Sequence, residues 1–158
     1  MIKEADPSCW PAVWPFWQRI VRAGAAFAFD EDATYEVARE LWMPRGARVF
    51  VAEESGAVVG SAYLRANYGG PARRIANAGF MVDPAYAGRG IGRELAEHVM
   101  ERAEQAGFEG MVFNSVVATN PAMGLWRSLG FAVVGTIPAA FHHPEHGPTD
   151  LLILHRRL

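Results

Sequence analysis

The spacing of apolar residues changes along the chain. In four segments apolar side chains recur every three or four residues, which predicts helices over residues 10 to 21, 33 to 43, 91 to 106 and 121 to 129. Six shorter runs are rich in β-branched and aromatic residues, which predicts strands over residues 48 to 53, 57 to 64, 75 to 82, 111 to 117, 131 to 137 and 151 to 155. The chain therefore mixes helices and strands.

Proline and capping residues refine the helix boundaries. Pro11 and Pro15 both lie in the first predicted helix, and a proline one turn inside a helix removes a backbone hydrogen bond, so we expect this helix to bend or to start late. Asp32 or Thr34 caps the second helix. Asn120 precedes a proline and is expected to cap the last one.

The order of the strands indicates how the sheet begins. Residues 48 to 53 and 57 to 64 are joined through Glu54, Ser55 and Gly56, which is typical of a hairpin. A further strand follows after a short glycine-rich loop, so these strands are expected to form an antiparallel meander. We find no internal repeat or linker, and a single α+β domain over residues 1 to 158 is the simplest interpretation.

Composition narrows the range of partners. Hydrophobic residues make up 51% and charged residues 20% of the chain, which indicates a folded core rather than disorder. The formal net charge is −2, with no basic run, so neither nucleic acid nor a membrane is an expected partner. Cys9 is the only cysteine and no signal-peptide pattern is present, which favours a cytoplasmic protein. Its partner should be a small molecule, and a homodimer is one option for its assembly.

A glycine-rich turn over residues 83 to 92 carries the first chemical signal. Gly88, Gly90 and Gly92 let the backbone turn sharply, and the positive end of the following helix dipole points to the same place, which favours an anion. A tight strand-to-helix connection without a ligand is an equal alternative. The dinucleotide fingerprint needs glycine at the sixth position, where Arg93 stands, and the Gly-Lys-Ser/Thr ending of a P-loop is missing.

The surrounding residues resemble a known family. Residues 80 to 92, followed by residues 120 to 122 and 125 to 131, are similar to the motifs of the GNAT superfamily of acyl-CoA N-acyltransferases. The resemblance implies a GNAT fold: a central mixed, mostly antiparallel sheet of six to seven strands, flanked by about four helices and splayed between the strands at 75 to 82 and 111 to 117. It also implies acetyl-CoA as the cosubstrate, with no metal.

The same resemblance implies a set of coenzyme-binding residues. The strand before the turn would pair its main chain with the pantetheine arm and offer an N–H to the oxyanion, and the backbone of the turn would hold the pyrophosphate. Arg89 would be free to reach an outer phosphate. The full set is Phe80, Met81, Val82, Ala87, Gly88, Arg89, Gly90, Ile91, Gly92, Asn120 and Trp126.

Three positions depart from the family pattern. Ala87 stands where an Arg or Gln is usual, which leaves phosphate binding to the backbone. Asn120 lies one residue nearer to the end of the motif than usual, so the loop is shortened or Thr119 takes its place. Trp126 replaces a Tyr that would protonate the thiolate; an indole is no acid near neutral pH, so we interpret Trp126 as a packing residue.

Two asparagines are the candidates on the acceptor side. Asn77 and Asn114 each lie within an apolar strand that flanks the expected acyl group, and a buried amide needs partners. Either they bind the acceptor or they bond to neighbouring backbone. No general base is assigned, because the carboxylates considered have no distinguishing signature. These are Asp30, Glu31, Asp32 and Glu53.

The C-terminal third narrows the resemblance to a subgroup. Residues 113 to 117, 134 to 144 and 150 to 154 are similar to the subgroup that includes proline-analogue (azetidine-2-carboxylate) N-acetyltransferases, which implies a small amino acid or analogue as acceptor. His142, His143 and His146 raise a zinc site as an alternative to a solvated loop over the acceptor cleft.

The leading hypothesis is direct attack of a small amine on acetyl-CoA within a ternary complex. The alternatives are a non-catalytic acyl-CoA sensor and a protein N-terminal acetyltransferase.

Overall fold

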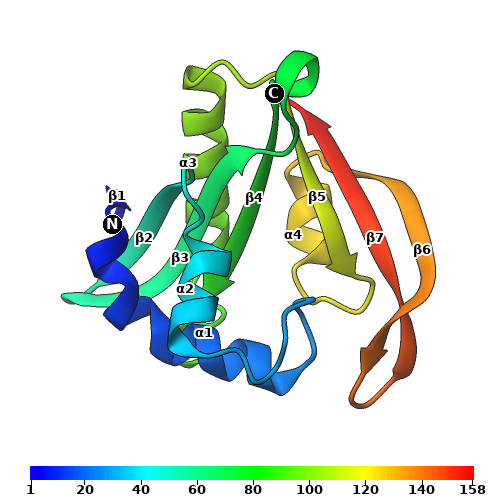
Figure 1. The fold of residues 1–158 in the computed structure, drawn as a ribbon, viewed down its shortest axis with the longest axis horizontal. Helices are drawn as coiled ribbons and strands as arrows, with labels where there is room; N and C mark the ends of the chain where they lie inside the picture. The colour runs from blue at the N-terminus through cyan, green and yellow to red at the C-terminus, as the bar shows by residue number, and fades with distance from the viewer.

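The computed structural model describes all residues from Met1 to Leu158 and contains one seven-stranded sheet (Figure 1). The strand order is β1-β2-β3-β4-β5-β7-β6, and every neighbouring pair is antiparallel except β4 and β5, which are parallel. The strands are β1 (Ile2–Ala5), β2 (Arg48–Glu54), β3 (Ala57–Ala66), β4 (Ile75–Val82), β5 (Gly110–Val117), β6 (Ala132–His143) and β7 (Gly147–Arg157). The predicted mixed, mostly antiparallel sheet is confirmed.

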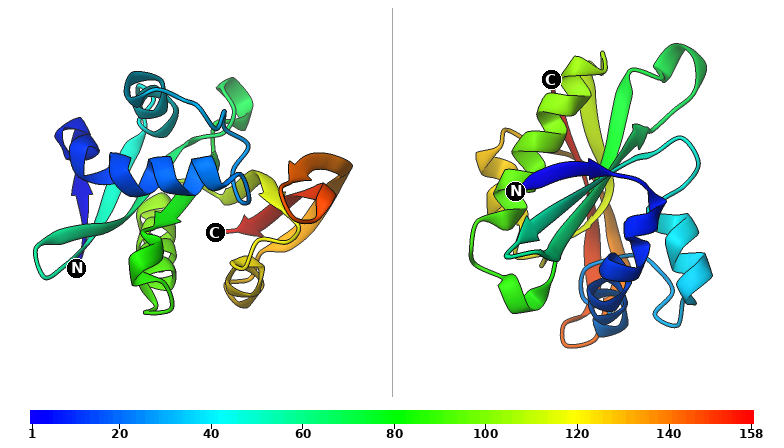
Figure 2. Two further views of the ribbon diagram at one scale, coloured as in Figure 1. Left: turned by 90° about the horizontal axis from the view of Figure 1, so that it is seen from below. Right: turned by 90° about the vertical axis from the view of Figure 1, so that its left-hand side faces the viewer.

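Four α-helices flank the sheet, on two faces. They are α1 (Trp10–Ala23), α2 (Tyr35–Trp42), α3 (Ile91–Gln105) and α4 (Met123–Ser128). Figure 2 shows α1 and α2 on one face of the sheet and α3 and α4 on the other. The packing agrees, because one buried cluster joins α1 and α2 to the sheet and a larger one joins α3 and α4 to it. None of the helices has the length and apolar character that a bilayer crossing requires.

Several predicted boundaries need correction. The first helix starts at Trp10 and continues past Pro15 to Ala23, so it does not start late. The last helix starts at Met123 rather than at residue 121. Asn120 instead closes a turn before it, because its Oδ1 accepts the N–H of Ala122 at 2.9 Å.

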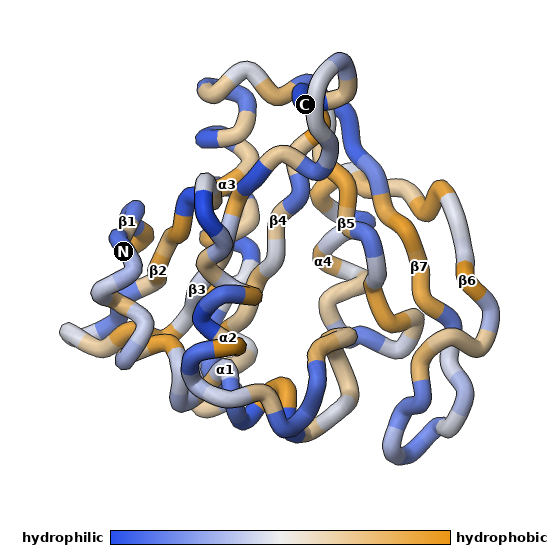
Figure 3. Tube along the Cα trace, in the orientation of Figure 1, coloured by the Kyte–Doolittle hydropathy of each residue, from blue (hydrophilic) through white to orange (hydrophobic).

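The sheet is also longer than predicted at both edges. The short strand β1 was not expected, because it contains only two apolar residues; ion pairs from Lys3 to Glu53 (2.6 Å) and from Arg48 to Glu4 (2.7 Å) help to hold it. At the other edge β6 and β7 pair beyond the predicted ranges through a register shift, within which Ala139 has a φ of 52°. Figure 3 shows apolar residues along the middle of β7 and polar ones at the tip of this hairpin.

The central strands separate, as predicted. β4 and β5 pair only where Ile75–Asn77 lies beside Gly110–Val112, and they diverge beyond this point (Figure 1). One edge of β4 therefore has no partner strand over residues 78 to 82. This unpaired edge opens a cleft in the middle of the sheet, next to the turn that leads into α3.

Candidate functional site

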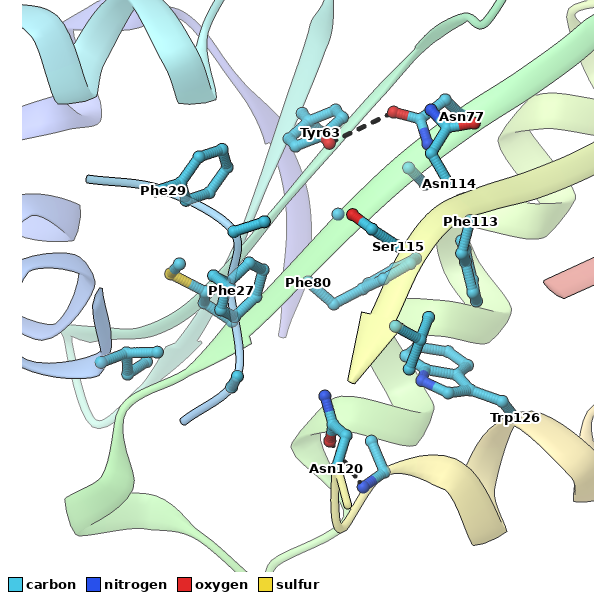
Figure 4. A pocket seen from close by; sticks show the side chains of 18 of the residues that line it. Phe27, Phe29, Tyr63, Asn77, Phe80, Phe113, Asn114, Ser115, Asn120 and Trp126 are labelled. Carbon is cyan, nitrogen blue, oxygen red and sulfur yellow. Dashed lines mark hydrogen bonds between the residues drawn. The ribbon is translucent and has the colours of Figure 1, made fainter. Parts of the chain in front are cut away.

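A cavity of about 400 Å³ lies where β4 and β5 diverge (Figure 4). Its walls come from β3, β4 and β5, from the loop between α1 and α2, and from the segment that leads into α4. Most of the lining residues are apolar. A cavity of this size, apolar with a few polar groups, is typical of a small-molecule site.

The alternation of side chains along the strands divides the cavity into two sides. Tyr63 is paired with Gly79 and Arg65 with Asn77 across β3 and β4, so these side chains share the face that carries α1 and α2. Phe80, one residue along, faces the α3 and α4 side and packs in the larger cluster. The polar side chains of β3 and β4 that line the cavity therefore lie on the face that carries α1 and α2, which we call the polar side, and the opposite side, with Phe80, Phe113 and Trp126, adjoins the glycine-rich turn.

The glycine-rich turn is a cradle of free N–H groups. The backbone N–H groups of residues 88 to 93 have no acceptor in the protein. Gly88 and Gly90 have φ values of 77° and 82°, which a residue with a Cβ adopts only at a cost, and the turn is solvent-exposed from Ala87 to Gly90. Gly90 is the N-cap of α3, so the helix dipole reinforces the site. A phosphate group fits this arrangement.

Arg89 is engaged rather than free. Its Nη1 lies 2.8 Å from Glu54 Oε1, and its guanidinium lies 4.9 Å from the centre of the Tyr86 ring. The expectation of a free Arg89 is therefore wrong for this structure. Because exposed ion pairs are worth at most about 1 kcal/mol, release of Arg89 toward a phosphate would cost little.

The unpaired edge of β4 includes the three residues expected to contact pantetheine. The side chain of Met81 is buried in the cluster with α1 and α2, whereas Phe80 and Val82 are half-buried on the other face. All three line the cavity. Ile91 is buried and Gly92 half-buried at the start of α3, so they can offer only backbone groups to a ligand at the turn.

Trp126 lies in an aromatic group on the same side of the cavity. Its side chain is only 7% exposed, and its ring centre lies 5.2 Å from that of Phe80, 4.7 Å from Phe113 and 5.9 Å from Phe131. This is the environment of a packing residue. Asn120 lines the same side, and Figure 4 shows its amide nitrogen toward the cavity, while its oxygen accepts the N–H of Ala122.

Asn77 is buried on the polar side, and both ends of its amide make a hydrogen bond. Its Oδ1 accepts a hydrogen bond from the Tyr63 hydroxyl at 3.2 Å (Figure 4). Its Nδ2 donates to the carbonyl of Val112 at 3.0 Å. The second bond joins β4 to β5 at the last paired position. The Tyr63 ring lies against Gly79, where a Cβ would come within 2.4 Å of it. Asn77 therefore stabilises the point at which β4 and β5 begin to separate, and it holds Tyr63 in the cavity.

Asn114 forms a reciprocal amide pair with Asn67, which follows β3. Asn114 Nδ2 donates to Asn67 Oδ1 at 2.7 Å, and Asn67 Nδ2 donates to Asn114 Oδ1 at 3.1 Å. Asn114 is exposed and lines the cavity. The pair ties the loop after β3 to β5 across the mouth of the cavity.

No carboxylate or histidine lines the cavity. Glu53, on β2, forms an ion pair with Lys3 of β1, and the carboxylate of Glu31 lies against Gly24. His143 belongs to the β6–β7 hairpin, where its Nδ1 accepts the N–H of His146. No group of three or more His, Cys, Asp and Glu side chains is arranged to hold a metal.

The sequence interpretation missed the aromatic wall in the loop between α1 and α2. Phe27 and Phe29 line the cavity, and Figure 4 shows them across from Phe113 and Trp126. Their rings stack with centres 5.7 Å apart, and Phe29 also stacks on Trp17. The only indication of this wall in the sequence is the pair of phenylalanines among alanines, in a segment whose apolar residues do not have helical spacing.

Tyr63 should leave a signature in the stability of the protein at alkaline pH. Burial raises the pKa of the Tyr63 phenol above its usual value of 10.0. The folded state thus favours the neutral phenol, and its contribution is complete below a pH of about 10 and is lost as pH rises through the folded-state pKa. Urea unfolding at pH values of about 8 and 11 should show a smaller loss of stability for Tyr63→Phe than for the wild type. Equal losses would contradict this.

Comparison with known proteins identifies the family. Residues 9–131 match the Acetyltransferase (GNAT) family, and the chain belongs to it. The chain is 46% identical to a GCN5-related N-acetyltransferase from Kribbella flavida, covering 100% of this chain and 97% of that one, with a TM-score of 0.95. It is 27% identical to yncA, a putative acetyltransferase from Salmonella typhimurium whose structure holds its cofactor acetyl-CoA, covering 100% and 93% with a TM-score of 0.86.

A curated relative matches over part of the chain. N-acetyltransferase aca1 of Schizosaccharomyces pombe is 40% identical over 84 residues, which is 52% of this chain and 40% of that protein. The similarity thus spans less than half of that relative's length.

Proposed function

We propose that the protein is an acetyl-CoA-dependent N-acetyltransferase that acts on a small amine. The observation that carries the proposal is the set of free N–H groups over residues 88 to 93, placed next to the unpaired edge of β4 in a member of this family. The acetyl-CoA in the yncA structure supports the choice of acyl donor. When bound, acetyl-CoA would supply the thioester that the amine attacks.

The residues of this chain would divide the work between the two sides of the cavity. Backbone N–H groups from Gly88 to Arg93 would bind the diphosphate, and residues 80 to 82 would offer main-chain groups to the pantetheine arm. The Val82 N–H would stabilise the oxyanion, a contribution of a few kcal/mol for a well-placed donor. The amide nitrogen of Asn120 would add a side-chain contact. The acceptor would occupy the polar side, near Tyr63 and Asn114.

Side chains would take little part in proton transfer. No carboxylate or imidazole lines the cavity, so the ammonium group of the acceptor would lose its proton to solvent, directly or through a bound water, before it attacks. Thiols have a pKa near 8.5, which makes the thiolate a fair leaving group without an acid. Trp126 would then pack beside the acyl group and take no part in proton transfer. The rate should therefore rise with pH toward the pKa of the acceptor amine.

The acceptor in this proposal is a small amino acid or analogue, as in the proline-analogue N-acetyltransferase subgroup. The cavity of about 400 Å³, with aromatic walls from Phe27 and Phe29, supports a compact acceptor. A cytoplasmic location, which the single cysteine favours, is part of the proposal, and a homodimer is compatible with it. The alternatives are a non-catalytic acyl-CoA sensor and a protein N-terminal acetyltransferase.

Thiol release from acetyl-CoA separates these functions. Purified protein is incubated with acetyl-CoA and, in turn, amino acids, polyamines and short peptides, and free thiol is followed against a no-acceptor control. The proposal predicts release with small amino acids. Release with peptides alone would favour the N-terminal acetyltransferase, and binding of acetyl-CoA without release on any acceptor would favour the sensor.

A further inference from the structure

One cation faces the cavity, and it is unpaired. Arg65, on β3, is the only charged residue among those that line the cavity. Its side chain is exposed and takes part in no ion pair or hydrogen bond; its one specific contact is with the ring of Tyr63, whose centre lies 5.6 Å from the guanidinium. The guanidinium therefore keeps all of its donors available, and it gives the polar side of the cavity a positive charge.

The polar side chains of Tyr63, Asn77 and Asn114 already have partners, whereas the Ser115 hydroxyl, which also lines the cavity, makes no hydrogen bond. The Nδ2 of Asn77 donates to Val112, and the Nδ2 of Asn114 donates to Asn67. The Tyr63 hydroxyl donates to Asn77. Of the side chains that line this side, Arg65 therefore has the largest uncommitted set of donors. An anionic group that enters here would find a planar, bidentate partner in Arg65.

The strand register places Arg65 two residues from the level at which the edge of β4 becomes free. Arg65 pairs with Asn77, the last residue of β4 that pairs with β5, whereas Tyr63 and Gly79 lie two residues along, where the edge of β4 is free. Two residues of a strand span about 7 Å. In an α-amino acid the nitrogen and a carboxylate oxygen are about 3 Å apart, and a charge-assisted hydrogen bond adds about 2.8 Å. Together they make about 6 Å, somewhat less than the strand span, and the long, flexible Arg65 side chain can bridge the remainder.

We propose that Arg65 selects acceptors that carry a carboxylate next to the amine. This inference rests on the proposed function, and it names the substrate class of the same cavity. Arg65 binds the acceptor carboxylate, which directs the amine toward the free edge of β4. The same charge repels a second ammonium group, so polyamines and other cationic amines are excluded. Arg65 acts on binding and on orientation rather than on proton transfer.

The test compares amino acids with their carboxamides, which keep the amine and the side chain but lack the negative charge. L-Alanine, L-proline and L-phenylalanine, each with its amide, and putrescine are titrated by calorimetry into protein saturated with free coenzyme A, so that binding is measured without turnover. At least one of the acids should bind the wild type at least tenfold more tightly than its amide. Arg65→Gln should abolish this difference by weakening the acid alone, and Arg65→Glu should reverse it.

Arg73→Gln serves as the matched control. Arg73 is also an exposed arginine, but it lies outside the cavity and bonds only to the carbonyl of Gly70, so its loss should leave acid and amide binding as in the wild type. Arg65 has no structural partner apart from the Tyr63 ring, so its variants should melt close to the wild type.

The outcomes separate this inference from the proposed function. Preference for acids that vanishes in Arg65→Gln supports the inference even if no acetyl group is transferred. Equal binding of acids and amides, tighter binding of putrescine, no binding of any probe, or a preference that survives in Arg65→Gln overturns it. Thiol release with amides at the same rate as with acids would overturn it while leaving the acetyltransferase proposal intact.

Discussion

Replacing Gly90 by Glu is expected to abolish binding of acetyl-CoA. The substitution brings a carboxylate into a cradle whose free N–H groups, over residues 88 to 93, suit an anion. At about 5 Å, repulsion between the carboxylate and a phosphate charge amounts to roughly 3 kcal/mol at an effective dielectric constant of 20. The dissociation constant measured by calorimetry should rise at least about a hundredfold.

The control for Gly90→Glu lies at the other end of the same helix. Gly107 has a φ of 87°, close to the 82° of Gly90, and a Cβ at either position meets open space. Both substitutions therefore carry a similar backbone strain of about 1–2 kcal/mol and the same added charge. Gly107→Glu should lower the melting temperature at least as much, because its carboxylate lies at the negative end of the helix dipole, and should leave coenzyme binding intact. Equal coenzyme affinities of the two variants would show that the phosphate site lies elsewhere.

Replacing Gly79 by Ala is expected to disable the acceptor side while sparing the phosphate site. The new Cβ would lie 2.4 Å from Cε1 of Tyr63, so the ring must move and its bond to Asn77 is lost. Overpacking of this kind costs about 1–3 kcal/mol. The KM for the acceptor should rise at least about tenfold, with unchanged affinity for free coenzyme A. Gly135→Ala, on the distant strand β6, should leave this KM unchanged.

A double-mutant cycle isolates the clash. In a Tyr63→Ala background the added methyl group meets no ring, so Gly79→Ala should cost almost nothing in the free energy of unfolding. The coupling energy between the two sites should therefore equal most of the cost of the single substitution, about 1–3 kcal/mol. Additive effects of the two substitutions on urea unfolding would mean that Gly79 does not position Tyr63.

The sequence predicted best where local chemistry decides the structure. The turn from Gly88 to Gly90 needs glycine because of its positive φ values, and no distant contact is required to recognise it. The long amphipathic helix α3 and the strands β2 to β5 were also predicted from local sequence. The regular spacing of their apolar residues marks the face that is buried. The separation of β4 from β5 was predicted from the resemblance to the GNAT superfamily and not from the spacing of apolar residues.

The parts that the sequence did not predict depend on contacts between distant segments. Asn77 and Asn114 were singled out as polar residues in apolar strands, but their partners Tyr63 and Asn67 follow from the register of β3 against β4 and from the fold of the loop after β3. Arg65 carries no functional signal in the sequence, because an arginine near the end of a strand is usually an ordinary surface residue. Arg65 lines a cavity only because β4 and β5 separate next to it.

The most direct test of acetyl transfer is the mass of the product. Acetyl-CoA and a small amino acid, L-proline or L-alanine, are incubated with the protein, and the mixture is analysed by mass spectrometry alongside the thiol assay. We expect an N-acetylated amino acid in an amount equal to the thiol released, and no such product with Gly90→Glu. Thiol release without an acetylated product, or product formed equally well by Gly90→Glu, would contradict it.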